Sequence, residues 1–393
     1  MKQGWEIKRL GDVCNVLNGL WIGKKEPFIN ICVIRNTNFT KDCKLNLDNV
    51  AYIDAEAKQF ASRKLLVGDI IVEKSGGSEK QPVGRVVLFD VAIGDYSFSN
   101  FTSALRVKDG VDVIPKYLHR CLYAHYLRGE TYKLQSKTTG LHNLDMKGYL
   151  RLPIPVPPLA EQEKIVAELD CLSGIIEKKK QQLKELDNLA QSIFYEMFGE
   201  NAEGRNKWKI AKLGNVCKTT SGGTPSKGHP EYYEGGDIPW LRSGEVNKMN
   251  IHETELFITE EGLNNSSAKW FPKDTVVIAM YGATVGQVGI LCNSMTTNQA
   301  ICGIFPNETF IPIYLYHFLL SKKPEYLEIA TGGAQANISQ NIVRDTVVSC
   351  PPLALQQDFA SKIEAIEKQK ELIAQSIKEA ETLFNSRMDY YFN

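Results

Sequence analysis

The sequence predicts an α+β protein in which two similar mixed α/β domains are separated by two long antiparallel coiled-coil helices and related by a pseudo-two-fold repeat. Three observations lead to this prediction. A ten-residue phrase occurs twice, as "WEIKRLGDVC" at residues 5–14 and as "WKIAKLGNVC" at residues 208–217. A second phrase also occurs twice, as "PPLAEQEKI" at residues 157–165 and as "PPLALQQDF" at residues 351–359. After each copy of the second phrase, apolar residues follow a heptad pattern, which is typical of coiled coils.

The order of these signals divides the chain into alternating domains and helices. We predict a first domain at residues 1–156, a first helix at 157–199, a second domain at 200–350 and a second helix at 351–393. A chain of 393 residues is long enough for two domains of ordinary size. Repetition over this distance indicates two copies of one domain fold.

Within each predicted domain, the same features follow one another. "GDIIVEKSGGSEKQPVGRVVLF" at residues 68–89 resembles "KDTVVIAMYGATVGQVGIL" at residues 273–291, and both predict a strand, a glycine-rich turn and a second strand. "SNFTSALRV", which begins at Ser99, resembles "TNQAICGIF", which begins at Thr297. A helical stretch then follows in each half, so each domain is expected to mix strands and helices.

The two long helices are predicted from steps of four and three between apolar residues. Pro157 and Pro158 precede an acidic first turn, and Gly199 follows the last periodic residue of the first helix, as is typical of helix ends. Lys179 and Lys370 interrupt the apolar seam, and such polar positions fix helix register or face another partner. The residues that we expect to form the coiled-coil core are Ile165, Leu169, Leu172, Ile176, Leu183, Leu186, Ile193, Phe359, Ile363, Ile366, Ile373, Ile377 and Phe384.

Simple dimensions predict how the helices run. A helix over residues 160–198 is about 58 Å long at 1.5 Å per residue. A domain of about 150 residues has a radius of gyration of only about 15 Å, so it cannot easily return the chain to the far end of that helix. We therefore expect the second helix to begin where the first one ends and to run antiparallel to it, with one domain at each end of the rod.

Composition narrows the class of protein. The net charge is zero, but residues 1–155 carry 23 basic and 16 acidic side chains, an excess of seven positive charges. The nine cysteines show neither a disulfide framework nor a metal-binding Cys-x-x-Cys pair. The longest apolar stretch, residues 276–281, is far too short to span a membrane, and the first residues lack the apolar run of a secretory signal. We expect a cytoplasmic protein.

Catalytic motifs are weak throughout. "GLWIGKK" at residues 19–25 is one residue shorter than a Walker loop and has Lys25 where Ser or Thr would hold the metal. "GDIIVEK" contains Glu73 and Lys74 as neighbours, and adjacent strand residues point to opposite faces, so they would not share a nuclease metal. The two Pro-Pro pairs start helices and lack the Asn or Asp that an amino-methyltransferase motif requires, and the six histidines are scattered. We expect no catalytic residue and no metal site.

The arrangement of repeats and helices resembles the specificity subunit of type I restriction-modification enzymes, over essentially the whole chain. The matching motifs are the opening phrase with Trp5 and Trp208, the two helix starts "PPLAEQEKI" and "PPLALQQDF", and the phrases "SGGTPS" at residues 221–226 and "IPWLRSGEV" at residues 238–246. The first domain shows no clear counterparts of the last two phrases. In that family each domain is a target-recognition domain, and the helices dock methyltransferase subunits.

This resemblance implies a non-catalytic subunit that binds double-stranded DNA. Because the two domains differ in sequence, they should recognise different half-sites of an asymmetric bipartite target. The resemblance also implies two methyltransferase subunits and restriction subunits as partners, and no membrane. S-adenosylmethionine, ATP and Mg²⁺ would be bound by those partners, with no cofactor in this chain.

The candidate DNA-binding residues are polar, cationic or aromatic side chains in predicted loops. Each of them could equally be a solvated surface charge or an aromatic residue of a domain core. Trp5 and Trp208 belong to the shared phrase, so we expect them to anchor each domain to the helices and not to touch DNA. The candidates are Lys24, Lys25, Arg35, Lys74, Lys80 and Lys137 in the first domain, and Lys227, Trp240, Arg242, Ser243 and Tyr281 in the second.

Two other functions compete with this hypothesis. A coiled-coil scaffold whose domains bind proteins would show the same repeat but no DNA sequence preference. A self-sufficient nuclease or methyltransferase would be active as an isolated chain, and we rank it last because its motifs are missing.

Overall fold

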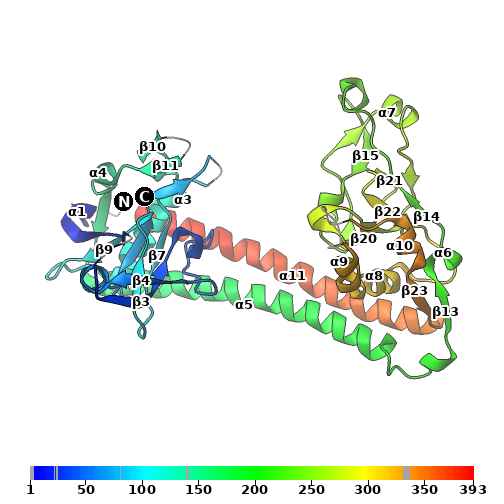
Figure 1. Ribbon diagram of the computed structural model, residues 1–393, viewed down its shortest axis with the longest axis horizontal. Helices are drawn as coiled ribbons and strands as arrows, with labels where there is room; N and C mark the ends of the chain where they lie inside the picture. Colours follow the sequence, from blue (N-terminus) through cyan, green and yellow to red (C-terminus); the bar gives the residue numbers. More distant parts are fainter. Residues whose placement is uncertain (1–3, 22, 24, 80, 139–140, 331–336) are drawn as a thin grey trace. The chain divides into compact units, whose positions relative to one another are not determined.

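Two α/β domains and two long helices make up the described chain (Figure 1). The computed structural model describes residues 4–21, 23, 25–79, 81–138, 141–330 and 337–393, and for residues 137 and 138 it describes the backbone. Contacts divide the chain into unit 1, which comprises Met1–Lys180 with Gln375–Asn393, and unit 2, which comprises Gln181–Ala374. Each unit thus contains one domain, the first part of the helix that follows it, and the last part of the other helix.

The first domain consists of short strands and short helices. In chain order its elements are β1 (Glu6–Arg9), α1 (Leu10–Val13), β2 (Cys14–Asn18), β3 (Phe28–Ile34), η1 (Asn36–Asn38), β4 (Ala51–Glu56), α2 (Ala57–Arg63), β5 (Ile70–Glu73), β6 (Ser75–Gly77), β7 (Val86–Leu88), β8 (Tyr96–Phe98), β9 (Thr102–Val107), α3 (Pro115–Leu127), η2 (Glu130–Leu134), β10 (Gln135–Thr138), β11 (Leu141–Leu144), α4 (Met146–Tyr149) and β12 (Pro153–Val156). The main sheet has the order β2-β9-β5-β7, and a second sheet has the order β4-β3-β8. Strand β5 is buried along its whole length because it lies between β9 and β7.

The second domain repeats this plan with small additions. Its elements are η3 (Arg205–Lys207), β13 (Lys209–Lys212), α6 (Leu213–Val216), β14 (Thr219–Ser221), η4 (Pro230–Tyr232), β15 (Ile238–Leu241), η5 (Ser243–Glu245), β16 (Asn250–Ile251), β17 (Phe257–Ile258), α7 (Glu260–Asn264), β18 (Trp270–Phe271), β19 (Val276–Ala279), η6 (Gly282–Thr284), β20 (Val288–Leu291), β21 (Met295–Thr297), β22 (Ile301–Ile304), α8 (Pro312–Ser321), α9 (Lys323–Ala330), α10 (Gln340–Asp345) and β23 (Val347–Cys350). The main sheet has the order β14-β22-β19-β20-β16, and a second has the order β17-β15-β21-β18.

The internal repeat is confirmed at the level of strand register. Strand β5 pairs antiparallel with β9 as β19 pairs with β22, and β3 pairs parallel with β8 as β15 pairs with β21. In the parallel pairs, Ile34 faces Phe98 in the first domain and Leu241 faces Thr297 in the second. Phe98 and not Ser99 is therefore equivalent to Thr297, so the sequence alignment of these two segments is wrong by one residue. Local similarity alone could not fix the register, because alternate residues of a strand face opposite sides.

The repeated opening phrase joins the start of each domain to its end. Strand β1 pairs with β12, and β13 pairs with β23, so each phrase lies beside the strand that leads into a long helix. The main-chain N–H of Leu10 donates to Leu152 O over 3.0 Å, and that of Leu213 donates to Thr346 O over 2.9 Å. The ring of Trp208 lies 6.1 Å from that of Phe198, the last residue of the first long helix, as expected for an anchor.

The long helices are α5 (Leu159–Phe198) and α11 (Leu353–Phe392), which confirms the predicted helix over residues 160–198. A buried glutamine fixes the start of each helix to its domain. Gln162 accepts a 2.9 Å hydrogen bond from the N–H of Ile114 and donates to Asp112 O over 2.8 Å. Gln356 accepts from the N–H of Ile311 over 2.8 Å and donates to a neighbouring carbonyl in the same way. This pairing explains why both helix-start phrases contain glutamine at this position.

The two helices are antiparallel within each unit, as predicted. In unit 1, Arg387 forms an ion pair with Glu168, and Lys180 Nζ lies 2.9 Å from Glu381 Oε1. In unit 2, Lys370 Nζ lies 2.7 Å from Asp187 Oδ1, and the rings of Phe194 and Phe359 lie 5.7 Å apart. In both units, higher residue numbers on α5 meet lower numbers on α11.

Most of the predicted coiled-coil residues are buried. Leu183, Leu186, Ile193 and Ile373 are only partly buried. Lys370 is held by Asp187 and by Glu367, with Nζ to Oε1 also 2.7 Å, so this seam position is occupied by an ion pair. The buried members of the predicted set are Ile165, Leu169, Leu172, Ile176, Phe359, Ile363, Ile366, Ile377 and Phe384.

Candidate nucleic-acid interface

Each domain has one edge where a strand ends in a 3₁₀ turn that begins with arginine. Strand β3 leads through Arg35 into η1, and β15 leads through Arg242 into η5. In both turns the side chain of the third residue, Asn38 or Glu245, accepts a hydrogen bond from the arginine N–H, over 2.9 Å and 3.2 Å respectively. The first domain therefore does contain a counterpart of "IPWLRSGEV", namely "ICVIRNTNF" at residues 31–39. This counterpart was not recognised from the sequence because the two turns have the arginine in common and little else.

The first-domain edge, which we define as Asn18, Arg35, Asn36, Lys74 and Phe101, is polar with one exposed aromatic ring. Lys74 Nζ donates to Asn18 Oδ1 over 3.3 Å, and the Lys74 N–H donates to Phe101 O over 3.0 Å. Partial burial lowers the pKa of the Lys74 ammonium. A cation beside amides and an exposed ring suits contact with phosphates and bases.

A buried ion pair supports this edge from below. Arg85 Nε lies 2.8 Å from Glu73 Oε2, and both side chains are almost completely buried. Arg85 also donates to Asn36 O over 3.2 Å, and Asn36 Nδ2 donates to Glu73 Oε1 over 3.2 Å. Burial alone would lower the pKa of Arg85, but the hydrogen bonds and the charge of Glu73 raise it. The carboxylate considered above for a nuclease site therefore serves to hold the turn.

The second domain has a groove at the equivalent edge, to which we refer as the second-domain groove. It brings together three residues predicted from the sequence, Lys227, Trp240 and Arg242, with several that the sequence did not single out. Asn298 and Gln299 come from the turn between β21 and β22, and only their place in the weak echo "TNQAICGIF" marked them. The groove is lined by Thr224, Lys227, Tyr233, Trp240, Arg242, Leu256, Asn298 and Gln299.

Trp240, which the sequence predicted as a DNA contact, is buried in the domain. Its side chain is only 4% exposed, and it packs with Ile258 and Ala268 in a small apolar cluster. Its indole N–H donates to Gly223 O over 2.9 Å, so its one polar group is already bonded. A tryptophan in a loop phrase looks the same in sequence whether it points outward or inward. Here it forms the floor of the groove.

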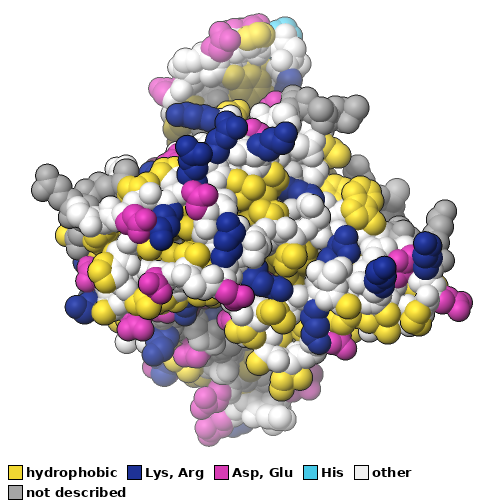
Figure 2. All heavy atoms as spheres, turned by 90° about the vertical axis from the view of Figure 1, so that its left-hand side faces the viewer, with side chains coloured by type: hydrophobic (Ala, Val, Ile, Leu, Met, Phe, Trp, Pro, Cys, Tyr) yellow, Lys and Arg dark blue, Asp and Glu magenta, His cyan; other side chains and the backbone are white. Residues whose placement is uncertain are grey.

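The other predicted residues lie at several places. Lys25 is exposed, as is Arg35, while Ser243 is half-buried next to Arg242. Tyr281 is exposed and pairs through its backbone with Asn337, and it does not line the second-domain groove. Lys24 and Lys80 lie outside the described residues, and so does the side chain of Lys137. Figure 2 shows Lys and Arg side chains spread among hydrophobic ones over one face of unit 1.

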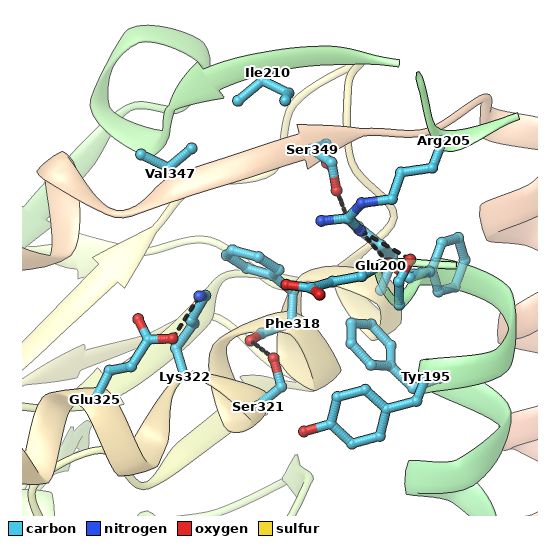
Figure 3. Close-up of a pocket in the computed structure, with 14 residues that line it drawn as sticks. Tyr195, Glu200, Arg205, Ile210, Phe318, Ser321, Lys322, Glu325, Val347 and Ser349 are labelled. Atoms are coloured by element: carbon cyan, nitrogen blue, oxygen red, sulfur yellow. Dashed lines mark hydrogen bonds and ion pairs between the residues drawn. The ribbon is translucent and has the colours of Figure 1, made fainter. Parts of the chain in front are cut away.

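A separate hollow in unit 2 belongs to the joint between domain and helix (Figure 3). Its floor is aromatic, with the rings of Phe198 and Tyr314 4.7 Å apart, and Arg205 Nη1 donates to the Phe198 carbonyl at the end of α5. Unit 1 repeats the aromatic contact, with Tyr117 and Phe392 5.4 Å apart. Because this contact occurs in both units, we assign the hollow to the shared architecture and not to recognition of a particular sequence.

The described residues contain neither a cluster of metal ligands nor a helix that could cross a membrane. Across residues 4–21, 23, 25–79, 81–138, 141–330 and 337–393, no three His, Cys, Asp or Glu side chains gather as metal ligands would. None of the helices in those same ranges is both long and apolar enough to cross a bilayer.

Comparison with known proteins identifies the family. The model of the type I restriction modification DNA specificity domain matches residues 2–188 and 205–382. The EcoR124I/EcoR124II specificity subunit of Escherichia coli is 25% identical over 76% of this chain and 75% of its own length. The putative MjaX specificity subunit of Methanocaldococcus jannaschii is 24% identical over 96% of this chain and 91% of its own.

Two solved structures share the fold. A chain from a study of assembly and conformational transition of a type I restriction-modification system has a TM-score of 0.61, 20% identity, and coverage of 100% of this chain and 98% of that one. The S subunit of a type I restriction-modification system from M. genitalium has a TM-score of 0.56, 14% identity, and coverage of 99% of this chain and 96% of that one. Since the family model matches two segments that together make up most of the chain, this protein belongs to the family of DNA specificity subunits of type I restriction-modification enzymes.

Proposed function

We propose that this chain binds an asymmetric, two-part DNA site and that each domain contacts one half-site. One observation carries the proposal: the two domains share strand register and helix attachment, but they differ in side chains at the equivalent edge. Lys74 and Met280 show this difference. Their N–H groups donate to equivalent carbonyls, of Phe101 and Ala300, over 3.0 Å and 2.8 Å, but one side chain is a cation and the other is apolar. Equivalent geometry with different chemistry is what two different half-sites require.

The division of the chain follows from the same argument. We propose that residues 1–156 and 200–350 recognise DNA, and that residues 157–199 and 351–393 hold the two domains in register. The proposed DNA contacts are Lys24, Lys25, Arg35, Lys74, Lys80 and Lys137, with Lys227, Arg242, Ser243 and Tyr281, after removal of the buried tryptophan. Asn298 and Gln299 join this set because they line the second-domain groove.

We further propose that catalysis resides in partners: two methyltransferase subunits with S-adenosylmethionine, and restriction subunits with ATP and Mg²⁺. A two-fold repeat supports two copies of one partner, because equivalent surfaces bind equivalent molecules. Ile7 and Ile210 are apolar, occupy the same place in the repeated phrase, and are 45% and 67% exposed. We place one methyltransferase contact at each. The complex would work in the cytoplasm, where its DNA lies.

The docking proposal is tested by co-purification. Ile7→Lys or Ile210→Lys should each lower the number of methyltransferase subunits bound per chain from two to one, and the double variant should bind none. The matched control is Lys209→Ala, which changes a neighbouring exposed residue. Unchanged binding in the double variant would remove these isoleucines from the interface.

The DNA proposal is tested by mapping methylated bases genome-wide in cells that make this chain with its methyltransferase. We expect a motif with two unlike half-sites separated by bases of no preference. A single contiguous palindrome, or no motif, would contradict the proposal.

A coiled-coil scaffold without DNA specificity is the alternative that we set aside, since the family is one of DNA specificity subunits. A gel shift of the assembled complex on its mapped site separates the two functions. A scaffold would bind the mapped site and a scrambled one equally.

A further inference from the structure

The guanidinium of Arg242 is held along one side by two carboxylates. Arg242 Nε donates to Glu245 Oε1 over 3.1 Å, and Nη2 forms an ion pair with Glu255 Oε2. Glu245 is itself fixed, because it accepts hydrogen bonds from the N–H groups of Arg242 and Glu255, over 3.2 Å and 2.7 Å. Its side chain is only 12% exposed. The orientation of the arginine head group is therefore set before any ligand arrives.

The opposite side of the same guanidinium remains available to a ligand. A guanidinium has five N–H bonds, and these two contacts use one on Nε and one on Nη2. In the described part of the chain, the guanidinium of Arg242 forms these two hydrogen bonds and none through Nη1. The two terminal nitrogens present parallel N–H bonds, and the residue lines the second-domain groove with Thr224 and Asn298. A parallel pair of donors matches O6 and N7 at the major-groove edge of guanine.

We propose that Arg242 recognises a guanine in the half-site bound by the second domain, with Glu255 and Glu245 as positioning residues. This inference rests on the proposed function. A free arginine loses rotamer entropy when it is fixed on a base, and it can turn to a phosphate instead. The two carboxylates remove that freedom in advance and repel phosphates from the same spot. With these carboxylates in place, the Arg242 guanidinium can discriminate between bases and does not act as a nonspecific cation.

The equivalent arginine of the first domain lacks this support. The Arg35 N–H donates to Asn38 Oδ1 over 2.9 Å, and Arg35 Nη2 donates to Asn49 O over 3.4 Å. Both partners are neutral, and in the described ranges no carboxylate pairs with the Arg35 guanidinium. Arg35 thus occupies the same backbone position with a head group that is free to follow a phosphate. It provides a matched control within the same chain.

The test compares Arg242→Lys, Glu255→Ala and Arg35→Lys in the complete complex with its methyltransferase subunits. Lysine keeps the positive charge but loses the planar pair of donors. Glu255 is largely exposed, so its removal should not disturb folding. For each variant, the fraction of methylated sites is measured for every base at every position of the motif.

We expect Arg242→Lys to lower the preference for guanine at one position of one half-site by about tenfold or more, while the other half-site is unchanged. Glu255→Ala should relax the same position by a smaller factor. Arg35→Lys should change the total level of methylation at most, with all base preferences kept.

Several results would overturn the inference. One is a wild-type motif without a G·C pair in either half-site. Another is equal loss of methylation at all sites in Arg242→Lys, which would indicate a phosphate contact. If Arg242→Lys fails to assemble, Glu255→Ala decides, and an unchanged base preference there rejects the role of the carboxylates. If the wild type gives no two-part motif, the proposed function itself fails.

Discussion

The two units attach their domains to the long helices at the same position with different chemistry. Tyr117 of α3 and Tyr314 of α8 are equivalent, since each hydroxyl donates a 2.8 Å hydrogen bond to a carbonyl of the strand before a long helix. Three residues later, α3 carries Arg120 and α8 carries His317. Both side chains face the helix pair.

In unit 1 the contact is polar. Arg120 Nη2 donates to Asp170 Oδ1 over 2.9 Å, and Lys116 Nζ lies 2.6 Å from Asp170 Oδ2. The Arg120 guanidinium also lies over the ring of Phe384 at 5.7 Å. Part of the attachment in unit 1 is therefore electrostatic.

In unit 2 the contact is aromatic. The ring of His317 lies 5.2 Å from that of Phe359 and 6.1 Å from that of Phe194. His317 Nε2 is buried and has no hydrogen-bond partner among the described residues, so the neutral imidazole packs as an aromatic ring. The comparison teaches that this position accepts side chains of different chemistry, while the shared tyrosine hydrogen bonds keep the geometry of the attachment. The two units should consequently respond to different conditions.

The largest difference should follow from Phe359→Ala. Phe359 is fully buried and touches three rings of unit 2, so its loss should destabilise that unit by about 3–5 kcal/mol. Hydrogen exchange followed by mass spectrometry reports the stability of each unit separately. Leu372→Ala, at an exposed position of the same helix, should cost under about 0.5 kcal/mol. Equal effects of the two changes would mean that the aromatic cluster does not support unit 2.

Acid should weaken unit 2 through His317. Burial, with a smaller contribution from the charge of Lys370, lowers the pKa of His317 to about 4. Below pH 6.5 the unfolded chain takes up a proton that the folded unit does not, so stability is complete above pH 6.5 and falls as the pH drops toward 4. We expect a loss of about 2 kcal/mol at pH 5 from this group.

The control for the acid effect is a substitution of His317 itself, because the other unit also contains a buried histidine. Burial likewise lowers the pKa of His119 in unit 1 to about 4, so unit 1 should also lose stability in acid. His317→Phe should abolish the histidine contribution in unit 2 alone, as measured by hydrogen exchange corrected for its own pH dependence. If unit 2 keeps its full acid sensitivity in this variant, His317 is not its source.

The sequence was sufficient to predict what the two halves share. The helices and their antiparallel direction followed from apolar spacing and domain size, because both reflect burial and chain geometry. Gln162 and Gln356 were visible in the repeated helix-start phrases, although their hydrogen bonds were not. Residues that stabilise the same backbone geometry in both halves occur at equivalent positions of the repeated phrases.

The edges proposed to bind DNA were less predictable, because they are built from residues far apart in the chain. Arg242 was found from its phrase, but Glu255 has no sequence signal that links it to that arginine. Asn298 enters the same groove from a turn more than 50 residues away. Trp240 is buried and its indole N–H bonds to the carbonyl of Gly223, a contact that sequence spacing cannot predict.

A smaller effect is expected where unit 1 depends on charge. Asp170→Asn should destabilise unit 1 by about 1 kcal/mol, since the ion pairs of Asp170 are partly exposed and are therefore screened by solvent. The difference should shrink as salt is raised. The matched control is Glu364→Gln at the equivalent position of α11, which forms no ion pair in the described part of unit 2. A salt-independent loss would indicate packing and not charge as the cause.

The smallest effect should come from exchanging the residues at one equivalent position of two turns. Gly68 and Asp274 precede β5 and β19, donate 2.8 Å hydrogen bonds to Phe89 O and Leu291 O, and have φ values of 97° and 65°. Asp274→Gly should stabilise unit 2 by up to about 1 kcal/mol, because only glycine adopts positive φ without a steric penalty. Gly68→Asp should cost a similar amount in unit 1, where its Cβ would also lie 3.2 Å from Pro115. Opposite signs in hydrogen-exchange stability would confirm that the two turns are equivalent. Equal signs would mean that surrounding contacts, and not the shared backbone conformation, decide which residue each turn accepts.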